Sequence, residues 1–456
     1  MRGYSAVIGG VVACLAVSAA GDRTQWDSPA IIDHPRPGEL VASPGEAVKI
    51  GRRLFLAKFN LADGAGRPGA TGDSKPTLRA QPVRQEFTRI ASLDANSCFG
   101  CHNDPVVGGS GDFAANVFVG AHFSDPPTQQ IDAEVTSERN TIGLRGAGLI
   151  EILAREMTTE LRAQLATGLA EARSGNKDVE IALGTKGVSF GSIVARADGT
   201  YDTRGLEGVD PDLVVKPFGF KGVAISLREF TINALNQHHG IQAIERFGWE
   251  RTGLSDFDGD GVKIELTAAQ VTALTLFQAS LPPPRRFAAR QLAAQIARGE
   301  RLFSQVECAG CHRPGLPIAA TTFSEPNPFN RPGNLVPGDV DRSVVIALPN
   351  SGAPNVVMAY SDLRRHRICD QEDPFFCNER RRQDNVPIDQ FMTPKLWDVA
   401  ASGPYGHRGD CTTLSEAIIH HSAEGKRSKE LFLKLSEQEK SDVIQFLLSL
   451  GGGESP

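Results

Sequence analysis

The chain has 456 residues, a formal net charge of −6 and 40% hydrophobic residues. This length allows two or three domains with sizeable cores. The mild acidity without a basic stripe argues against a nucleic-acid partner, and beyond the N-terminus no run of residues is apolar enough for an integral membrane span.

Residues 1–20 have the features of an export signal. Arg2 provides a positive start, an apolar run extends from about Tyr4 to Val17, and either Val17-Ser18-Ala19 or Ser18-Ala19-Ala20 fits a small-residue cleavage site. The run is short for a membrane anchor. Lipidation at Cys14 is a less favoured variant because this Cys lies early within the apolar run. We therefore expect a periplasmic protein.

The remaining chain reads as two related halves. The segment 51–55 (GRRLF) resembles the segment 299–303 (GERLF), and each half ends in a helical pattern that begins after Thr267 or Ser436, both suitable N-caps. Three prolines at 282–284 cannot continue a helix and mark the boundary. The expected units are 21–281 and 285–456.

The first half carries an extra region at about 151–249. A helix is expected at Leu161–Arg173, followed by strands at Gly187–Ala195 and Val214–Phe220, with Asp198-Gly199 as a turn. The stretch 314–354 is rich in Pro, Asn and Gly and is expected to be an ordered loop. These patterns predict a small β-element attached to a helical fold.

A Cys-x-x-Cys-His motif occurs once in each half, at Cys98–His102 and at Cys308–His312. In this motif two thiols bond covalently to haem, and the adjacent His binds the iron. With only 8 Cys and 10 His in the chain, two chance copies are not expected. Zinc is the rival, but it would use all four cysteines in one tetrahedral site. The predicted fold is mainly α, with two cytochrome c-like helical domains, one haem c each, and the small β-containing insert.

Three cysteines remain outside the motifs and the signal. In an oxidising compartment two of them are expected to pair, most simply Cys369 with Cys377, which leaves one thiol. None of the three forms a redox Cys-x-x-Cys arrangement.

The sequence resembles the superfamily of bacterial di-haem cytochrome c peroxidases and MauG, closest to its di-haem oxidoreductase branch, which is also labelled thiol oxidoreductase. The two haem motifs carry the resemblance together with segments at 139–141 (RNT), 146–152 (GAGLIEI), 218–222 (FGFKG), 227–230 (LREF), 258–261 (DGDG), 360–363 (YSDL), 393–397 (TPKLW) and 403–409 (GPYGHRG).

The resemblance implies unequal haems. The N-terminal haem, bound through His102, would react with peroxide, and the C-terminal haem, bound through His312, would relay electrons. Its second iron ligand is expected at His421, with His420 as the neighbouring alternative. A His/His haem has a lower potential than a His/Met haem. Arg139, Arg145 and Arg408 are candidate partners of haem propionates.

At the reactive haem, Glu151 is the predicted distal acid that assists O–O cleavage by proton transfer. His122 lies in the segment where the peroxidases carry a displaceable distal His, and His238 and His239 are the alternatives. If none of them binds the iron, it is five-coordinate and open to peroxide or dioxygen.

Two calcium sites are candidate features. Asn140 with the carbonyls of Ser402 and Pro404 matches the calcium site of the peroxidases. Asp256, Asp258 and Asp260 have the oxygen spacing of an EF-hand loop, although its twelfth position is Thr267 rather than Glu. An acidic turn before the following helix is the alternative.

Three functions follow. The first is a peroxidase that takes electrons from a periplasmic donor such as a small cytochrome or a cupredoxin. The second is a MauG-like oxidase or oxygenase acting on a protein or organic substrate, with the insert shaping its site. The third is an electron-transfer cytochrome without catalysis. Two unequal halves favour an enzyme, because a carrier needs no such asymmetry.

Overall fold

A computed structural model describes residues 43–65, 95–111, 114–119, 136–287, 289–331, 343–349, 354–380 and 382–451. The predicted signal at 1–20, with Cys14, and the predicted distal His122 lie outside these residues. No helix in the described part of the chain combines the length and the apolar character that a membrane span requires.

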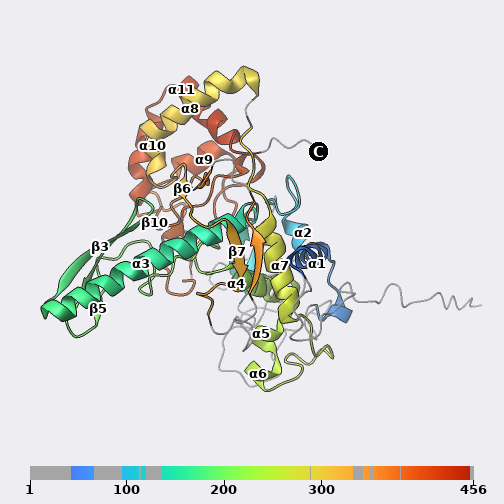
Figure 1. The fold of residues 1–456 in the computed structure, drawn as a ribbon. Helices are drawn as coiled ribbons and strands as arrows, with labels where there is room; N and C mark the ends of the chain where they lie inside the picture. The colour runs from blue at the N-terminus through green and yellow to red at the C-terminus, as the bar shows by residue number, and fades with distance from the viewer. Residues whose placement is uncertain are drawn as a thin grey trace, which may run out of the picture.

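Helices form the frame of the molecule and short antiparallel strands fill the connections (Figure 1). The helices are α1 Pro44–Leu56, α2 Cys98–Cys101, α3 Ala147–Gly175, α4 Leu227–Ala234, α5 Ile244–Phe247, α6 Trp249–Thr252, α7 Ala268–Ser280, α8 Ala293–Gln305, α9 Leu414–Ile419, α10 Lys426–Leu433 and α11 Glu437–Leu448. The strands are β1 Ala114–Val119, β2 Thr136–Asn140, β3 Val179–Thr185, β4 Val188–Ala195, β5 Tyr201–Asp202, β6 Leu316–Pro317, β7 Thr322–Glu325, β8 Val344–Ala347, β9 Val356–Val357, β10 Arg365–Arg367 and β11 Gln390–Met392.

Two helix crossings repeat the same packing. In the first, α1 crosses α7 so closely that a Cβ on Gly51 would lie 1.9 Å from the carbonyl oxygen of Ala273. In the second, α8 crosses α11, and a Cβ on Gly299 would lie 1.9 Å from the carbonyl oxygen of Asp442. The phenylalanine one turn after each glycine packs on a phenylalanine of the partner helix, with ring centroids 5.2 Å apart in both crossings. The sequence similarity between 51–55 and 299–303 therefore corresponds to the same helix packing in both halves.

The second helix of each crossing begins where the sequence indicated. Thr267 caps α7 and Ser436 caps α11, each in a capping box with the residue three positions later. Every residue of α7 from Ala268 to Ala279 is buried. The reason is that α1, α3 and α4 all pack against it, and its buried polar side chains find partners, such as Gln278 on Thr231 at 2.7 Å.

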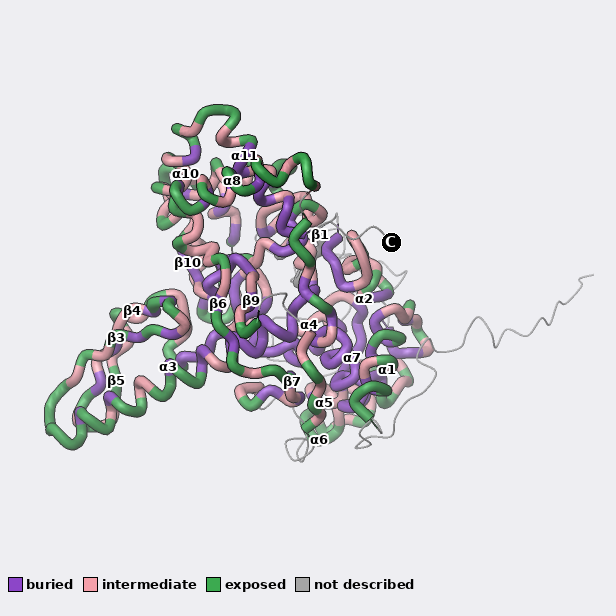
Figure 2. Tube along the Cα trace, turned by 45° about the horizontal axis from the view of Figure 1, so that its top comes forward, coloured by how far each residue is buried: buried purple, intermediate pink, exposed green. Residues whose placement is uncertain are grey.

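The insert forms an arm that projects from the rest of the molecule (Figures 1 and 2). Its helix α3 has 29 residues, about 43 Å in length, and begins at Ala147, earlier than the predicted Leu161. The antiparallel sheet β3-β4-β5 packs along its outer part. The predicted turn connects β4 to β5, with Gly199 at φ +90°.

Two predictions about strands are wrong. Val214–Phe220 contains no strand; Val215 donates its backbone N–H to Thr158 Oγ1 of α3 at 3.0 Å, and the successive residues Val214 and Val215 are both buried rather than alternate ones. Conversely, the stretch 314–354 is not only loop, because β6, β7 and β8 lie in it. Strands of two to four residues are too short for a visible period-two pattern.

Buried contacts join the two halves. The Lys221 ammonium donates to the carbonyls of Pro387, Ile388 and Gln390, each at 2.8 Å, which uses all three of its protons. Trp397 packs on Gly146, the residue that caps α3 at φ +72°, where a Cβ would lie 2.2 Å from the indole ring. The core around α3 therefore contains residues from both halves.

Candidate functional site

The first Cys-x-x-Cys-His motif forms a short helix, α2, which Ser97 caps by accepting the N–H of Gly100 at 3.1 Å. His102 follows directly, and its Nδ1 lies 3.2 Å from the carbonyl of Gly109. Burial lowers the pKa of His102 to about 4, so the ring is neutral. A neutral imidazole that donates through Nδ1 keeps its Nε2 lone pair for a metal.

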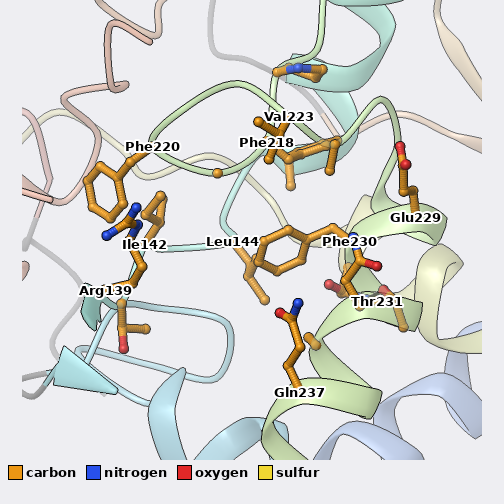
Figure 3. Close-up of a pocket in the computed structure, with 18 of the residues that line it drawn as sticks. Arg139, Ile142, Leu144, Phe218, Phe220, Val223, Glu229, Phe230, Thr231 and Gln237 are labelled. Atoms are coloured by element: carbon orange, nitrogen blue, oxygen red, sulfur yellow. Dashed lines mark hydrogen bonds between the residues drawn. The ribbon is translucent and has the colours of Figure 1, made fainter. Parts of the chain in front are cut away.

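This motif opens onto a cavity of about 960 Å³, at the upper end of the ~300–1,000 Å³ range of ligand pockets. Aromatic and aliphatic side chains form much of its wall, with Arg139 near one end and Glu229 at the other (Figure 3). The apolar wall includes Ile142, Leu144, Phe218, Phe220, Val223 and Phe230.

His238 and His239 also line this cavity, at the end of a π-helical turn, Leu235–His239, that continues α4. Such turns occur often at functional sites. The Nδ1 of His239 bonds the carbonyl of Ala95, and its Nε2 lies 3.7 Å from the Cys98 sulfur. Burial, together with His238, lowers the pKa of His239 to about 3. Both alternatives to His122 are therefore in reach of a ligand in the cavity.

The second motif repeats the proximal arrangement. The Nδ1 of His312 lies 3.0 Å from the carbonyl of Tyr360. Phe303 packs 6.5 Å from His312, just as Phe55 packs 6.3 Å from His102. Burial and the neighbouring His421 lower the pKa of His312 to about 4. His312, like His102, is therefore a neutral imidazole whose Nε2 lone pair is available to a metal.

The structure places His421, rather than His420, on the side of His312. His421 is buried, its Nδ1 lies 2.7 Å from the carbonyl of Ala417, and it interacts electrostatically with His312. His420 instead stacks on Phe375 at 3.6 Å and contacts Asp373. The two adjacent histidines therefore have different surroundings, and only His421 is directed to the second haem motif.

None of the four motif cysteines forms a disulfide, whereas Cys369 and Cys377 form the predicted one. The third thiol, Cys411, is buried in the same small core. Two thiols and a neutral His at each motif, with a cavity at the first, are the groups that a covalently bound haem requires. The residues therefore fit two haem c groups.

The prediction that Glu151 is the distal acid conflicts with its position. Glu151 is fully buried and does not line the cavity. One carboxylate oxygen bonds Arg155 and Asn327, and the other accepts the N–H of Leu227 at 2.7 Å. These bonds anchor the start of α4 on α3. Two carboxylates line the cavity, Glu229 and Asp384, and Glu229 accepts the N–H of Ile225 at 2.7 Å and lies 3.3 Å from Arg331.

The predicted propionate partners Arg139 and Arg408 pair with protein carboxylates. Arg139 lines the cavity but makes two hydrogen bonds to Glu379, at 2.7 and 2.9 Å, and Arg408 bonds Glu138 at 2.9 Å. Arg145 lies 3.2 Å from Asp398. The arginines therefore join the two halves. This role could not be recognised from the sequence, because each partner lies far away along the chain.

The Glu379 carboxylate is the centre of that junction. It lies 3.3 Å from His407, which itself packs 4.2 Å from the ring of Phe391. Burial raises the pKa of Glu379, but hydrogen bonds from His407 and Arg139 outweigh it and hold the pKa at about 2. Arg139 and His407 lie in segments that the sequence singled out, but Glu379 had no sequence signal.

The candidate calcium residues are partly brought together. The Asn140 side chain bonds the carbonyl of Pro404, while Ser402 Oγ lies 3.4 Å from the carbonyl of Val399. At the acidic loop, ligand atoms of Asp256, Asp258 and Asp260 all lie within 4.8 Å of one another. Thr267 is occupied as the cap of α7, so the EF-hand pattern stops before its twelfth position.

Sequence comparison finds relatives over part of the chain. The cytochrome-c peroxidases IdrP2 and IdrP1 of Denitromonas iodatirespirans are both 27% identical to it, over 163 and 165 residues. The methylamine utilization protein MauG of Methylophilus methylotrophus is 38% identical over 68 residues, or 20% of its length. The chain spans 41% of the length of the two peroxidases, and the match covers 35% of this chain. No family model matches.

Two solved structures also align. One is a hydrazine synthase of Kuenenia stuttgartiensis, with 15% identity, a TM-score of 0.38 and coverage of 98% of this chain and 100% of that one. The other is a MauG-like protein associated with microbial copper homeostasis, with 17% identity, a TM-score of 0.29 and coverage of 66% and 88%. At these scores they carry no weight. The sequence relatives alone confirm the resemblance to the di-haem cytochrome c peroxidase and MauG superfamily; its branch stays a prediction.

Proposed function

We propose that this protein is a di-haem c-type peroxidase that reduces hydrogen peroxide at the N-terminal haem with electrons relayed by the C-terminal haem. The observation that carries the proposal is an asymmetry between two alike motifs. The first motif opens onto the 960 Å³ cavity, whereas His421 lies on the side of His312 at the second. An open site can bind an oxidant, and a closed site suits electron transfer.

In this proposal the chain forms two cytochrome c-like domains, 21–281 and 285–456, each with one haem c. The first haem would be held by Cys98, Cys101 and His102, and the second by Cys308, Cys311, His312 and His421. When bound, haem supplies the iron chemistry that cleaves the O–O bond and accepts single electrons.

The chain itself would supply binding, shielding and protons. Phe218 and Phe230 would limit the water in the cavity, and the carboxylates in its wall, Glu229 and Asp384, would pass protons to it. Arg331 lies beside Glu229 and also bonds Asp384 at 2.7 Å. The side chains of Arg331 and Asp384 are each more than a third exposed, so this pair connects the cavity to solvent. Peroxide, two electrons and two protons would give two water molecules.

The electrons would come from a one-electron periplasmic donor, such as a small cytochrome or a cupredoxin, after export and removal of residues 1–20. Calcium would bind at Asn140 with the carbonyls of Ser402 and Pro404, or at Asp256, Asp258 and Asp260. These assignments are part of the same proposal.

One observation favours a second function, a MauG-like oxidase or oxygenase. The aromatic side chains on the wall of the cavity, among them Phe218 and Phe230, suit an organic group beside the haem. In that case the electrons would come from an organic or protein substrate, with the residues of the cavity wall holding it, rather than from a small donor protein.

The test is spectroscopic. The pure oxidised protein is examined by EPR and optical absorption before and after one equivalent of peroxide, with and without partial reduction. A high-spin component that peroxide removes supports an enzyme, and turnover with reduced cytochrome or cupredoxin then separates peroxidase from oxidase. Two low-spin signals without any peroxide response would overturn the proposal and leave an electron carrier.

A further inference from the structure

His366 is a buried histidine with a carboxylate at each ring nitrogen. It lies on β10, and its side chain is 8% exposed. Nε2 lies 2.8 Å from Asp362 and Nδ1 lies 2.7 Å from Glu424. Both nitrogens must donate to satisfy two carboxylates, so the ring bridges them as an imidazolium.

Asp362 connects this ring to the loop that supports His312. Two residues earlier, the carbonyl of Tyr360 receives the Nδ1 of His312 at 3.0 Å. The backbone of the loop is strained, since Tyr360 has φ 52° and Leu363 has φ 55°, and such conformations persist only where surrounding contacts impose them. Ser361 Oγ donates to the carbonyl of Thr393 at 2.7 Å and fixes the loop further.

Glu424 connects the same ring to the segment that carries His421, three residues earlier in the chain. Its other oxygen accepts the backbone N–H of Arg367 at 2.9 Å. Ser422, which directly follows His421, donates its N–H to the carbonyl of Ile368 at 2.9 Å. The segment after His421 is thus fastened to β10 and to the residue that follows it.

The cluster is not a separate metal site. Cys311 lies 3.8 Å from His366 and shares a group of close donor atoms with Asp362 and His366. However, Cys311 belongs to the second haem motif, where its sulfur would be used in the covalent bond to haem. The ring of His366 is therefore held beside the haem attachment, with its two nitrogens committed to carboxylates.

We propose that Asp362, His366 and Glu424 form a positioning unit that holds His312 and His421, the two histidines that would bind the second haem, at a fixed separation. The unit would keep both histidines available to the iron. This inference rests on the proposed function, which assigns both histidines to that haem. None of the three residues touches the reacting atoms; they act through the loops that they join.

The experiment uses the full-length protein loaded with two haems, and its readout is the number of high-spin haems per chain by EPR of the oxidised state. The main variant is Glu424→Gln, whose side chain is 41% exposed and whose loss the fold should tolerate. We expect one additional high-spin haem in at least half of the molecules. Added imidazole should restore the low-spin signal. His366→Gln should give the same result.

Glu372→Gln is the matched control. Glu372 pairs with Lys426, two residues after Glu424, but its side chain is 71% exposed and has no bond to His366 in the described structure. Its spectrum should equal that of the wild type. Covalent haem content and thermal unfolding of each variant show that both haems are attached and the chain is folded.

The variant His421→Ala tests the proposed haem arrangement separately from the proposed positioning unit. If this variant keeps the wild-type low-spin signal, His421 is not a ligand and the proposed haem arrangement is wrong. If His421→Ala becomes high-spin while Glu424→Gln and His366→Gln remain low-spin, the arrangement stands and the positioning unit is refuted.

Discussion

The two Cys-x-x-Cys-His sites are alike on one side and different on the other. On the proximal side each histidine bonds a backbone carbonyl through Nδ1, at 3.2 Å for His102 and 3.0 Å for His312. Each also packs near a phenylalanine from a glycine-centred helix crossing. These shared features follow from the repeated sequence around 51–55 and 299–303.

The opposite sides differ because different segments follow. In the first half, α4 and its π-helical end border a large cavity with polar groups at its rim. In the second half, the chain after α9 brings in His421 and Glu424, and β10 fastens them. One proximal scaffold can therefore support an open site or a closed one, and the distal segments decide which.

The largest effect should come from exchanging the proximal histidines one at a time. His102→Met keeps both cysteines and the haem, but it should remove the spectral response to peroxide and lower turnover on the order of 100-fold, because a thioether, which donates less electron density and raises the potential, replaces the imidazole ligand of the open site. His312→Met should lower turnover as well while it leaves the peroxide response intact. Stopped-flow absorption measures both.

The reverse pattern would contradict the assignment of roles. If His312→Met abolished the peroxide response and His102→Met did not, the second site would be the reactive one. Phe99→Leu, at a partly exposed position within the first motif that leaves the three haem-binding residues in place, serves as the control.

The next largest effect is the loss of stability when alanine replaces the glycine at each helix crossing, which tests whether the two crossings are packed equally tightly. Gly51→Ala and Gly299→Ala each place a Cβ 1.9 Å from a backbone oxygen of the partner helix. Each should destabilise the protein by about 3 kcal/mol, because the helices must separate. Gly45→Ala, on the same helix as Gly51 with nothing within 4 Å of its Cβ, should not. Thermal unfolding measures all three; one tolerated crossing substitution would show that the two crossings differ in solution.

Local patterns were enough to predict the parts that repeat. The haem motifs, the N-caps Thr267 and Ser436 and the disulfide Cys369–Cys377 all depend on spacing along the chain. The roles of Glu151 and Arg139 could not be predicted in this way. Both have the charge that the expected roles require, but their partners Asn327 and Glu379 come from distant segments.

The same limit explains what was missed. Glu229 lies inside the 227–230 segment, yet only the fold places its carboxylate in the cavity wall rather than on a surface. Similarly, His366 resembles any isolated histidine in the sequence. Its meaning depends on Glu424, 58 residues later, and on the strained loop at Tyr360.

A smaller effect concerns the junction that couples the two halves. The pKa of Glu379 is about 2 in the folded protein, against an ordinary value of 4.5. Between these pH values the unfolded chain binds more protons, so the stabilisation is complete above pH 4.5 and disappears as the pH falls towards 2. Glu379→Gln should cost about 2–3 kcal/mol at pH 7, and the difference from wild type should vanish near pH 2.

Urea unfolding at pH 7, 4 and 3 measures this difference. Glu138→Gln is the matched control, since Glu138 pairs with Arg408 at the same junction but its side chain is 35% exposed, and exposed pairs contribute little. A pH-independent difference for Glu379→Gln would mean that this carboxylate is not an ionised partner of Arg139 and His407.

The smallest expected effect is that of calcium on thermal stability, which tests a difference between the segments that precede α7 and α11. The α7 segment contains Asp256, Asp258 and Asp260, whose close oxygens repel one another without a cation, whereas α10 precedes α11. Calcium at 1 mM should raise the melting temperature by roughly 2–4 °C over EDTA. Asp258→Asn should remove this gain if the loop is the site, and Asn140→Ala should remove it if calcium binds beside Pro404. Equal melting temperatures with calcium and with EDTA would show that the loop is an acidic turn before α7 and that neither candidate site binds the ion.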